Sequence, residues 1–233
     1  MARAWLIAFI TVIAMEFFVP AIVVIPLQRF GVHLAQIAQG WGHVAFGLYS
    51  ELSYGLAAAL AWHAVQHRWW MGGRWRWNLF GKGILGGVTV AIATSLAGAV
   101  ILKIFRHPLP SDVKDLIGPV GPHPHALIAL LVVLLFVAPV MEEWLFRGAL
   151  QTSLTQAVGT PVAVAFVALL FAGIHELDAA HPLRQPWIWT SILPLAAVLG
   201  IVRAKTRSMS GNIGIHWGFN AWGVFWILWP LWH

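Results

Sequence analysis

Three ionisable residues interrupt a long apolar stretch near the middle of the chain. Glu142, Glu143 and Arg147 follow a run of residues that carries no charge at all. Ionisable groups inside a lipid-spanning helix are unfavourable there and mark functional sites. Two later apolar segments each add one histidine, His175 and His216. We interpret the three segments as parts of one polar site.

The spacing predicts that Glu142 and Glu143 point in different directions from their helix and have different neighbours. Glu143 and Arg147 are four residues apart with the acid first, which is the favourable order for an ion pair on one helix face. Glu142 points about 100° away from its neighbour, because an α-helix has 3.6 residues per turn. We therefore expect Arg147 to neutralise one carboxylate while the other faces a cavity.

Each later segment also presents two side chains in one direction. Phe171 precedes His175 by four residues, and His216 precedes Asn220 by four. A buried carboxylate near positive groups suits a general base that activates water, and His175 would hold that water or carry its proton. His216 and Asn220 offer N–H donors for the oxyanion of a tetrahedral intermediate. The pattern predicts peptide hydrolysis without a covalent enzyme intermediate.

The composition places these segments in a membrane. Hydrophobic residues make up 60% of the 233 residues and charged residues only 9%, whereas soluble domains carry about 25% charged residues. We expect an all-α, multi-pass transmembrane bundle of about seven spans with a polar catalytic cavity inside the membrane. The expected helices are 5–27, 41–65, 79–103, 126–157, 161–177, 187–202 and 210–231.

The charge distribution indicates the orientation and excludes one class of partner. The formal net charge is +6, but the basic residues cluster between spans, at 68–76 and 203–207, so nucleic-acid binding is not expected. More basic residues fall on the side of the N-terminus, which predicts a cytoplasmic N-terminus in a cell membrane, in a bacterium the inner membrane. The chain has no cysteine, which excludes disulfides and thiolate chemistry.

The chain divides at a proline-rich loop. Residues 106–125 hold five prolines and mixed charge, so we expect N-terminal transmembrane helices and a loop in 1–125 and a catalytic helical core in 126–233. The core contains all the motif residues named above.

The geometry of an antiparallel hairpin would bring the acids and the first histidine to one depth. If 159–161 is its turn, Glu142 and His175 each lie about 24–26 Å from that turn at 1.5 Å per residue. The helix that carries the acids is longer than the membrane is thick, and Pro139 is its natural bend.

The motifs resemble those of a known family. Glu-Glu-x-x-x-Arg at 142–147, Phe-x-x-x-His at 171–175 and His-x-x-x-Asn at 216–220 occur in this order. This resembles the CAAX-processing and bacteriocin-processing (Abi, CPBP) family of intramembrane proteases, which includes the type II CAAX prenyl endopeptidases. The resemblance covers about 126–225, and the Phe-Arg-Gly at 146–148 fits it as well.

The resemblance implies a role for each motif residue. Glu142 would be the water-activating base, with His175 as its partner. Glu143 and Arg147 would be the supporting acid and its counter-ion. The oxyanion donors would be His216 and Asn220. The expected partners are the lipid bilayer and a membrane-associated protein or peptide substrate, with a prenylated tail, a bacteriocin leader and a C-terminal sorting signal as candidates.

Several alternatives stay open at this point. Glu142, His175 and His216 could ligate zinc, although the histidines lack the His-Glu-x-x-His spacing of zincins; we expect no cofactor and keep zinc as the alternative. A non-proteolytic membrane immunity or partner-binding protein of the same fold is a second function, and an ion pathway is a third. We expect Glu16 and Glu51, in the first two spans, to be structural.

Overall fold

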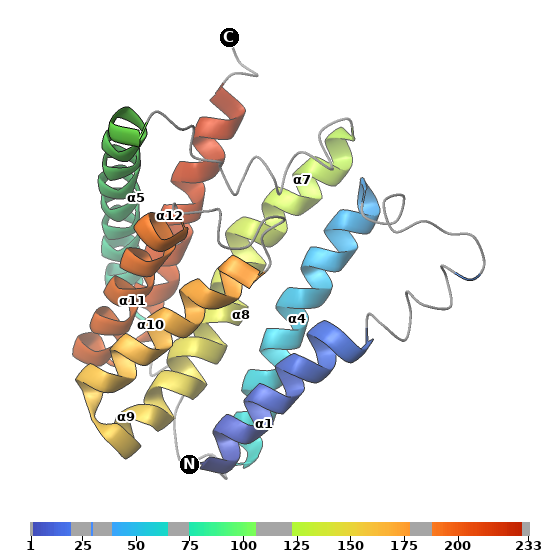
Figure 1. The fold of residues 1–233 in the computed structure, drawn as a ribbon, viewed down its shortest axis with the longest axis vertical. Coiled ribbons are helices and arrows are strands. Elements are labelled where there is room, and N and C mark those ends of the chain that lie inside the picture. Colours follow the sequence, from blue (N-terminus) through green and yellow to red (C-terminus); the bar gives the residue numbers. More distant parts are fainter. Residues whose placement is uncertain are drawn as a thin grey trace.

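The computed structural model describes residues 2–19, 29, 39–64, 75–105, 123–177 and 188–229. Every element in this part of the chain is helical, as the sequence predicts, and the helices form a bundle (Figure 1). The first expected helix extends to residue 27, and its portion 20–27 lies outside the described residues.

The helices follow the expected order and bounds closely. They are α1 (Ala2–Ile13) with η1 (Ala14–Phe18), α4 (Trp41–Ala64), α5 (Trp77–Phe105), then α7 (Pro124–Val132), η3 (Val133–Val137), α8 (Ala138–Glu143), η4 (Trp144–Gln151) and α9 (Thr152–Val158), and finally α10 (Thr160–Leu177), η5 (Ile188–Ile192) with α11 (Leu193–Thr206), and α12 (Met209–Leu228).

Among the described residues, three helices are long and apolar enough to cross a membrane: Trp41–His63, Trp77–Ile101 and Pro124–Val158. Two shorter apolar helices, Trp5–Glu16 and Thr160–His175, accompany them in the described part of the chain. Large apolar side chains on the outer face of α5, such as Leu85 and Ile104, are exposed. A helical bundle whose outer face is apolar is the expected form of a membrane protein.

The long helix from Pro124 to Val158 contains two π-helical turns, η3 and η4. Pro139 lacks an amide hydrogen and its ring clashes with a carbonyl one turn earlier in a regular α-helix. The π-helical turn η3 directly precedes this proline, and the Ala138 amide donates to the Val133 carbonyl, five residues back. A second π-helical turn, η4, begins immediately after Glu143. Turns of this kind occur often at functional sites.

Gly159 forms the turn between α9 and α10. Its φ of +85° lies in a region that glycine enters without a steric penalty. The chain reverses there, and α10 packs against α9, η4 and α11. The hairpin therefore returns the chain toward the level of the acids, as the sequence predicts.

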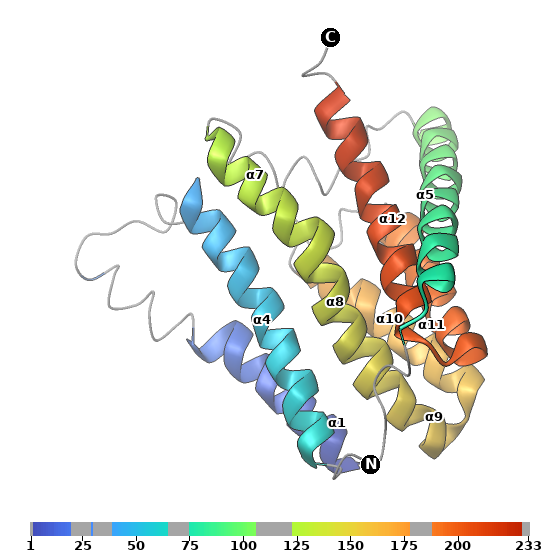
Figure 2. The ribbon, with the colours of Figure 1, turned by 180° about the vertical axis from the view of Figure 1, so that it is seen from behind.

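Glycines bring α5 and α12 into backbone contact. These two helices lie side by side in both views (Figures 1 and 2). A Cβ atom at Gly83 or Gly87 would overlap α12 backbone, and one at Gly214 or Gly218 would overlap α5 backbone. Small residues spaced by four allow this close approach in membranes. The contact fixes α12, the helix that carries His216.

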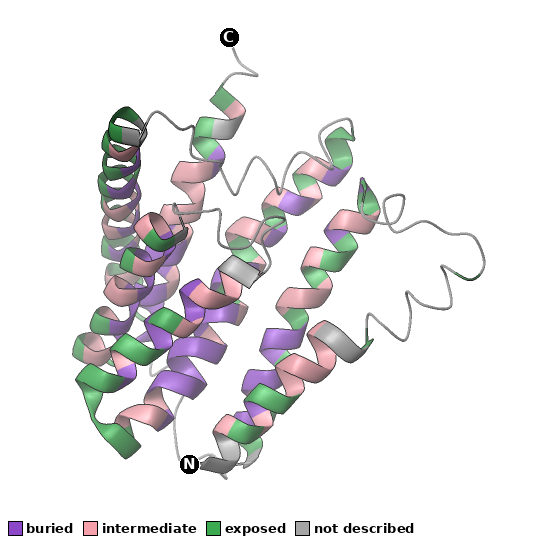
Figure 3. Ribbon diagram, viewed as in Figure 1, coloured by how far each residue is buried: buried purple, intermediate pink, exposed green. Residues whose placement is uncertain are grey.

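The remaining N-terminal helices cover the opposite side of the core. α4 packs against η4 and α8, and α1 packs against α4. The best-buried part of the bundle lies where α8 and η4 meet their neighbours (Figure 3). On this side Glu16 accepts hydrogen bonds from the Ser50 and Ser53 hydroxyls of α4, which fits the structural role expected of it.

Candidate active site

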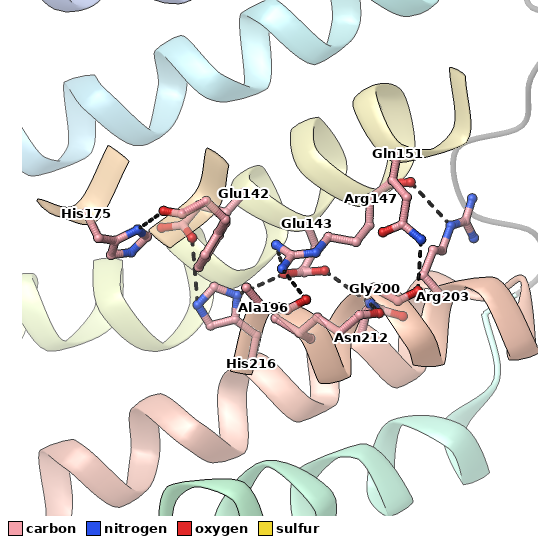
Figure 4. A network of polar contacts seen from close by, with 12 residues as sticks. Glu142, Glu143, Arg147, Gln151, His175, Ala196, Gly200, Arg203, Asn212 and His216 are labelled. Atoms are coloured by element: carbon pink, nitrogen blue, oxygen red, sulfur yellow. Dashed lines mark hydrogen bonds and ion pairs between the residues drawn. The ribbon is translucent and has the colours of Figure 1, made fainter. Parts of the chain in front are cut away.

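Glu143 is the centre of a buried hydrogen-bond network. Its Oε1 accepts from Arg147 Nη1 at 3.0 Å and from His216 Nδ1 at 3.2 Å. Its Oε2 accepts from Asn212 Nδ2 at 3.2 Å (Figure 4). The Glu143 and Arg147 side chains are completely buried. A buried ion pair is tolerated only when further hydrogen bonds satisfy its remaining atoms, and these contacts meet that need for Glu143.

Arg147 is held by more than its carboxylate. Its Nη2 donates to the Ala196 carbonyl of α11 at 3.2 Å. Its Cζ lies 4.4 Å from the centroid of the Phe171 ring, a distance at which a cation and an aromatic face attract each other. The guanidinium therefore links the acid helix to both α10 and α11.

Glu142 has a different environment from its neighbour. It is also buried, but its Oε2 has no hydrogen-bond partner among the described residues. His216 Nε2 lies 3.8 Å from that oxygen. The two acids thus divide as the helix spacing predicts, one neutralised and one with a free oxygen.

His175 contacts both the backbone and the ring of Phe171, and this ring also lies near His216. The Nδ1 atom lies 2.9 Å from the Phe171 carbonyl, and a carbonyl can only accept, so Nδ1 carries the proton and Nε2 is the basic nitrogen of the neutral ring. The Phe171 ring centroid lies 4.6 Å from that of His175 and 6.0 Å from that of His216. One aromatic ring therefore stands beside both imidazoles.

The structure brings most of the expected site residues together. His216 lies 3.8 Å from Glu142 and 3.2 Å from Glu143, Arg147 pairs with Glu143, and the Phe171 ring lies beside His175 and His216. Asn220 is placed differently: its Nδ2 donates to the Leu134 carbonyl of η3 at 2.9 Å. That contact ties α12 to the start of the acid-bearing rod. One of the two amide hydrogens of Asn220 is used in this way.

Three further polar residues join the network without having been expected from the sequence. They are Gln151, Arg203 and Asn212, and all three are buried. The spacing contained a signal for two of them, since Gln151 follows Arg147 by four residues and Asn212 precedes His216 by four. Arg203 had no such signal, because its sequence context is that of a basic residue at a helix end.

The residues that could ligate a metal are Glu142, His175 and His216. Among the described residues, no three histidine or carboxylate side chains are grouped closely enough to hold a metal ion. Both imidazoles use Nδ1 inside the protein, toward Phe171 O and Glu143, which is also how metal-bound histidines are oriented. The choice between a metal-free site and a zinc site stays a prediction for experiment.

Comparison with known proteins gives one match. Residues 124–222 match a family model described as type II CAAX prenyl endopeptidase Rce1-like. No curated protein and no solved structure matches the chain. The matched segment begins at the first residue of α7 and ends inside α12, so it contains every residue of the buried network and leaves out α1, α4 and α5.

Proposed function

We propose that the chain is an intramembrane endopeptidase, because residues 124–222 match a family model described as type II CAAX prenyl endopeptidase Rce1-like. It hydrolyses a peptide bond near the terminus of a membrane-associated protein or peptide. The matched family supports protease activity in general and a substrate that is associated with the membrane. The residue roles below are part of the proposal.

The division between the two acids is the observation that carries the proposal. Glu143 accepts hydrogen bonds from three side chains, so it has little capacity left to take up a proton. No described residue forms a hydrogen bond with Glu142 Oε2. A water molecule bound there would meet a carboxylate able to accept its proton, which is the requirement for a general base.

The reaction then proceeds in two balanced steps. The water oxygen bonds to the carbonyl carbon of the scissile peptide while Glu142 takes one water proton, and the carbonyl oxygen becomes an oxyanion. The C–N bond breaks as that proton passes to the departing nitrogen. The products are a carboxylic acid and an amine, and transfer of the acid's proton to the amine gives a carboxylate and an ammonium ion. The basic Nε2 of His175 can hold or transfer the proton during these steps.

The developing oxyanion needs N–H donors in a water-poor site. His216 donates through Nδ1 to Glu143. Its Nε2 can donate to the oxyanion only when both ring nitrogens carry hydrogens, and the proposed mechanism uses this doubly protonated ring. Asn220 is the second proposed donor. One of its amide hydrogens binds Leu134 O, and the other is left for the substrate.

The substrate class follows from the setting of the site. The acids lie within Pro124–Val158, a helix apolar and long enough to span a membrane, so the scissile bond must enter from a membrane-attached chain. A prenylated C-terminal tail, a bacteriocin leader and a C-terminal sorting signal all meet that condition. Lipid attachment would keep the peptide at the bilayer while its terminal residues reach Glu142.

The test uses purified full-length protein in lipid nanodiscs and two peptides of equal sequence, one prenylated near its C-terminus and one not. We expect cleavage by the wild-type protein and a loss of about 10²–10⁴-fold in Glu142→Gln, the usual contribution of a general base. Glu16→Gln is the matched control, because this carboxylate bonds Ser50 and Ser53 away from the site.

The outcomes separate the candidate functions. A Glu142→Ala protein that still cleaves would refute the assigned base. If wild-type protein cleaves no peptide, and Glu142→Ala, His175→Ala and His216→Ala all keep the cellular phenotype, the non-proteolytic immunity or partner-binding function is the better description.

A further inference from the structure

The π-helical turn η4 has a backbone carbonyl that is bound by side chains. The Thr152 amide, which follows this turn, donates to the Ala149 carbonyl. The Arg147 carbonyl accepts from Thr152 Oγ1 at 2.9 Å and from Arg203 Nε at 3.4 Å. Arg203 Nη2 also lies 3.5 Å from Thr152 Oγ1. Thr152 and Arg203 therefore form a clamp on the carbonyl of the residue that neutralises Glu143.

The clamp is one of three contacts that fasten η4 along a single face of α11. The Arg147 guanidinium binds the Ala196 carbonyl, and Gln151 Nε2 binds the Gly200 carbonyl at 2.8 Å. Ala196, Gly200 and Arg203 are spaced by four and three residues, which places them on one side of the helix. These three contacts hold the π-helical turn η4 against α11.

The same helix also holds α12 in register. The Leu199 carbonyl accepts from Asn212 Nδ2 at 2.7 Å, and that amide nitrogen also donates to Glu143 Oε2. Because α11 contacts the acid helix and the histidine helix through neighbouring carbonyls, a shift of η4 on α11 would change the distance between Glu142 and His216.

Arg203 is the second guanidinium among the buried ionisable groups of the described residues. Glu142, Glu143, Arg147 and Arg203 are all buried, giving two carboxylates and two guanidiniums. No carboxylate among the described side chains forms an ion pair with Arg203, and its charge is attracted by the more distant Glu143. A buried charge without a direct partner is expensive to maintain, and the backbone carbonyl of Arg147 is the group it binds instead.

We propose that Arg203 and Thr152 are positioning residues, which hold the π-helical turn so that Glu142 faces the His216 imidazole. The inference rests on the proposed function and deepens it. Neither side chain needs to touch the substrate. Their effect passes through the Arg147 carbonyl to the acids that precede it.

The experiment compares paired variants of the full chain in nanodiscs. Arg203→Met removes both the charge and the clamp, whereas Arg203→Lys keeps a charged donor. Thr152→Val removes only the hydroxyl, and Thr152→Ser restores it. Lys205→Met is the matched control, because this basic residue lies on α11 but is exposed.

We expect Arg203→Met to lower kcat by about 10²-fold, the effect of misplacing a catalytic group by about 1 Å, with KM nearly unchanged. Thr152→Val should lower kcat less. Arg203→Lys should recover part of the activity and Thr152→Ser most of it. Amide hydrogen exchange within 144–152 should accelerate in both impaired variants, and Lys205→Met should match the wild type in every measurement.

Folded Arg203→Met and Thr152→Val proteins with wild-type kcat and wild-type exchange would overturn the inference. A loss that appears in KM alone would also overturn it. If the wild-type protein proves inactive, the proposed function fails, and the exchange measurement still decides whether the clamp holds η4.

Discussion

His216 lies 3.2 Å from Glu143 through its Nδ1 atom, and this contact determines where the other ring nitrogen points. Nε2 lies 3.8 Å from Glu142 Oε2. One imidazole thus bridges the two acids, with its anchored side on the neutralised carboxylate and its other side on the carboxylate that has a free oxygen. The ring is a structural link between α12 and α8, and in the proposed mechanism it also binds the oxyanion.

Replacement of His216 should therefore affect chemistry and stability together. We expect His216→Ala to lower kcat by about 10²–10³-fold, the effect of removing one oxyanion donor. It should also lower the free energy of unfolding by about 1.5–3 kcal/mol, because a hydrogen bond to charged Glu143 is lost. Peptide cleavage and unfolding in detergent measure the two effects. His63→Ala, an exposed histidine of α4, is the control, and a fully active His216→Ala protein would contradict the assignment.

Replacement of Glu142 and replacement of Glu143 should have different effects on the free energy of unfolding. Glu143→Gln leaves the buried Arg147 guanidinium without its ionic partner, a change that destabilises proteins by about 3–5 kcal/mol. Glu142→Gln removes no hydrogen bond from Oε2 and should leave the unfolding transition much closer to that of the wild type. Thermal unfolding of the two variants side by side is the measurement. Equal destabilisation by both changes would show that the acids are not divided as described.

Part of the arrangement of the site could be predicted from the sequence, because the signal for that part is local. Four-residue spacing on a helix decides which side chains share a face, and it correctly paired Glu143 with Arg147. The hairpin turn predicted at 159–161 is present, with a positive φ at Gly159, whereas the common depth of Glu142 and His175 stays a prediction. The helix bounds followed from the alternation of apolar runs with prolines, glycines and charges.

The rest depended on contacts between helices. Nothing in the local sequence indicates that Arg203 binds the Arg147 carbonyl from 56 positions away, since that contact exists only once α11 lies along η4. The π-helical winding of η4 likewise reflects its tertiary contacts. Asn220 shows the limit of spacing arguments. It lies four residues after His216, but the spacing does not indicate that its amide donates to Leu134 O of η3.

The glycine contact between α5 and α12 gives a prediction with a close control. A methyl group at Gly87 would overlap the Ile215 carbonyl of α12, whereas one at Gly86 would meet only Ile215 Cγ1 at 3.7 Å. Gly87→Ala should lower the free energy of unfolding by about 1–3 kcal/mol, the usual effect of overpacking, and reduce cleavage by displacing His216. Gly86→Ala should behave like the wild type, and unfolding together with activity assays distinguishes them.

Chelation tests the cofactor expectation directly. With glutamate-activated water and no metal, we expect peptide cleavage to be unchanged after treatment with a strong zinc chelator and dialysis. Metal content and activity are measured on the same sample. Loss of cleavage that zinc restores would instead assign Glu142 and the two imidazoles as zinc ligands.

The backbone contact of α5 with α12 also limits which truncated proteins and chimeras of this chain can fold. The segment that matches the family model, 124–222, starts after α5 has ended, yet α12 places Gly214 and Gly218 directly against the α5 backbone. A truncated protein lacking 77–105 would present bare peptide groups to lipid on that face. Any chimera built around this catalytic core must therefore inherit α5 and α12 as a pair.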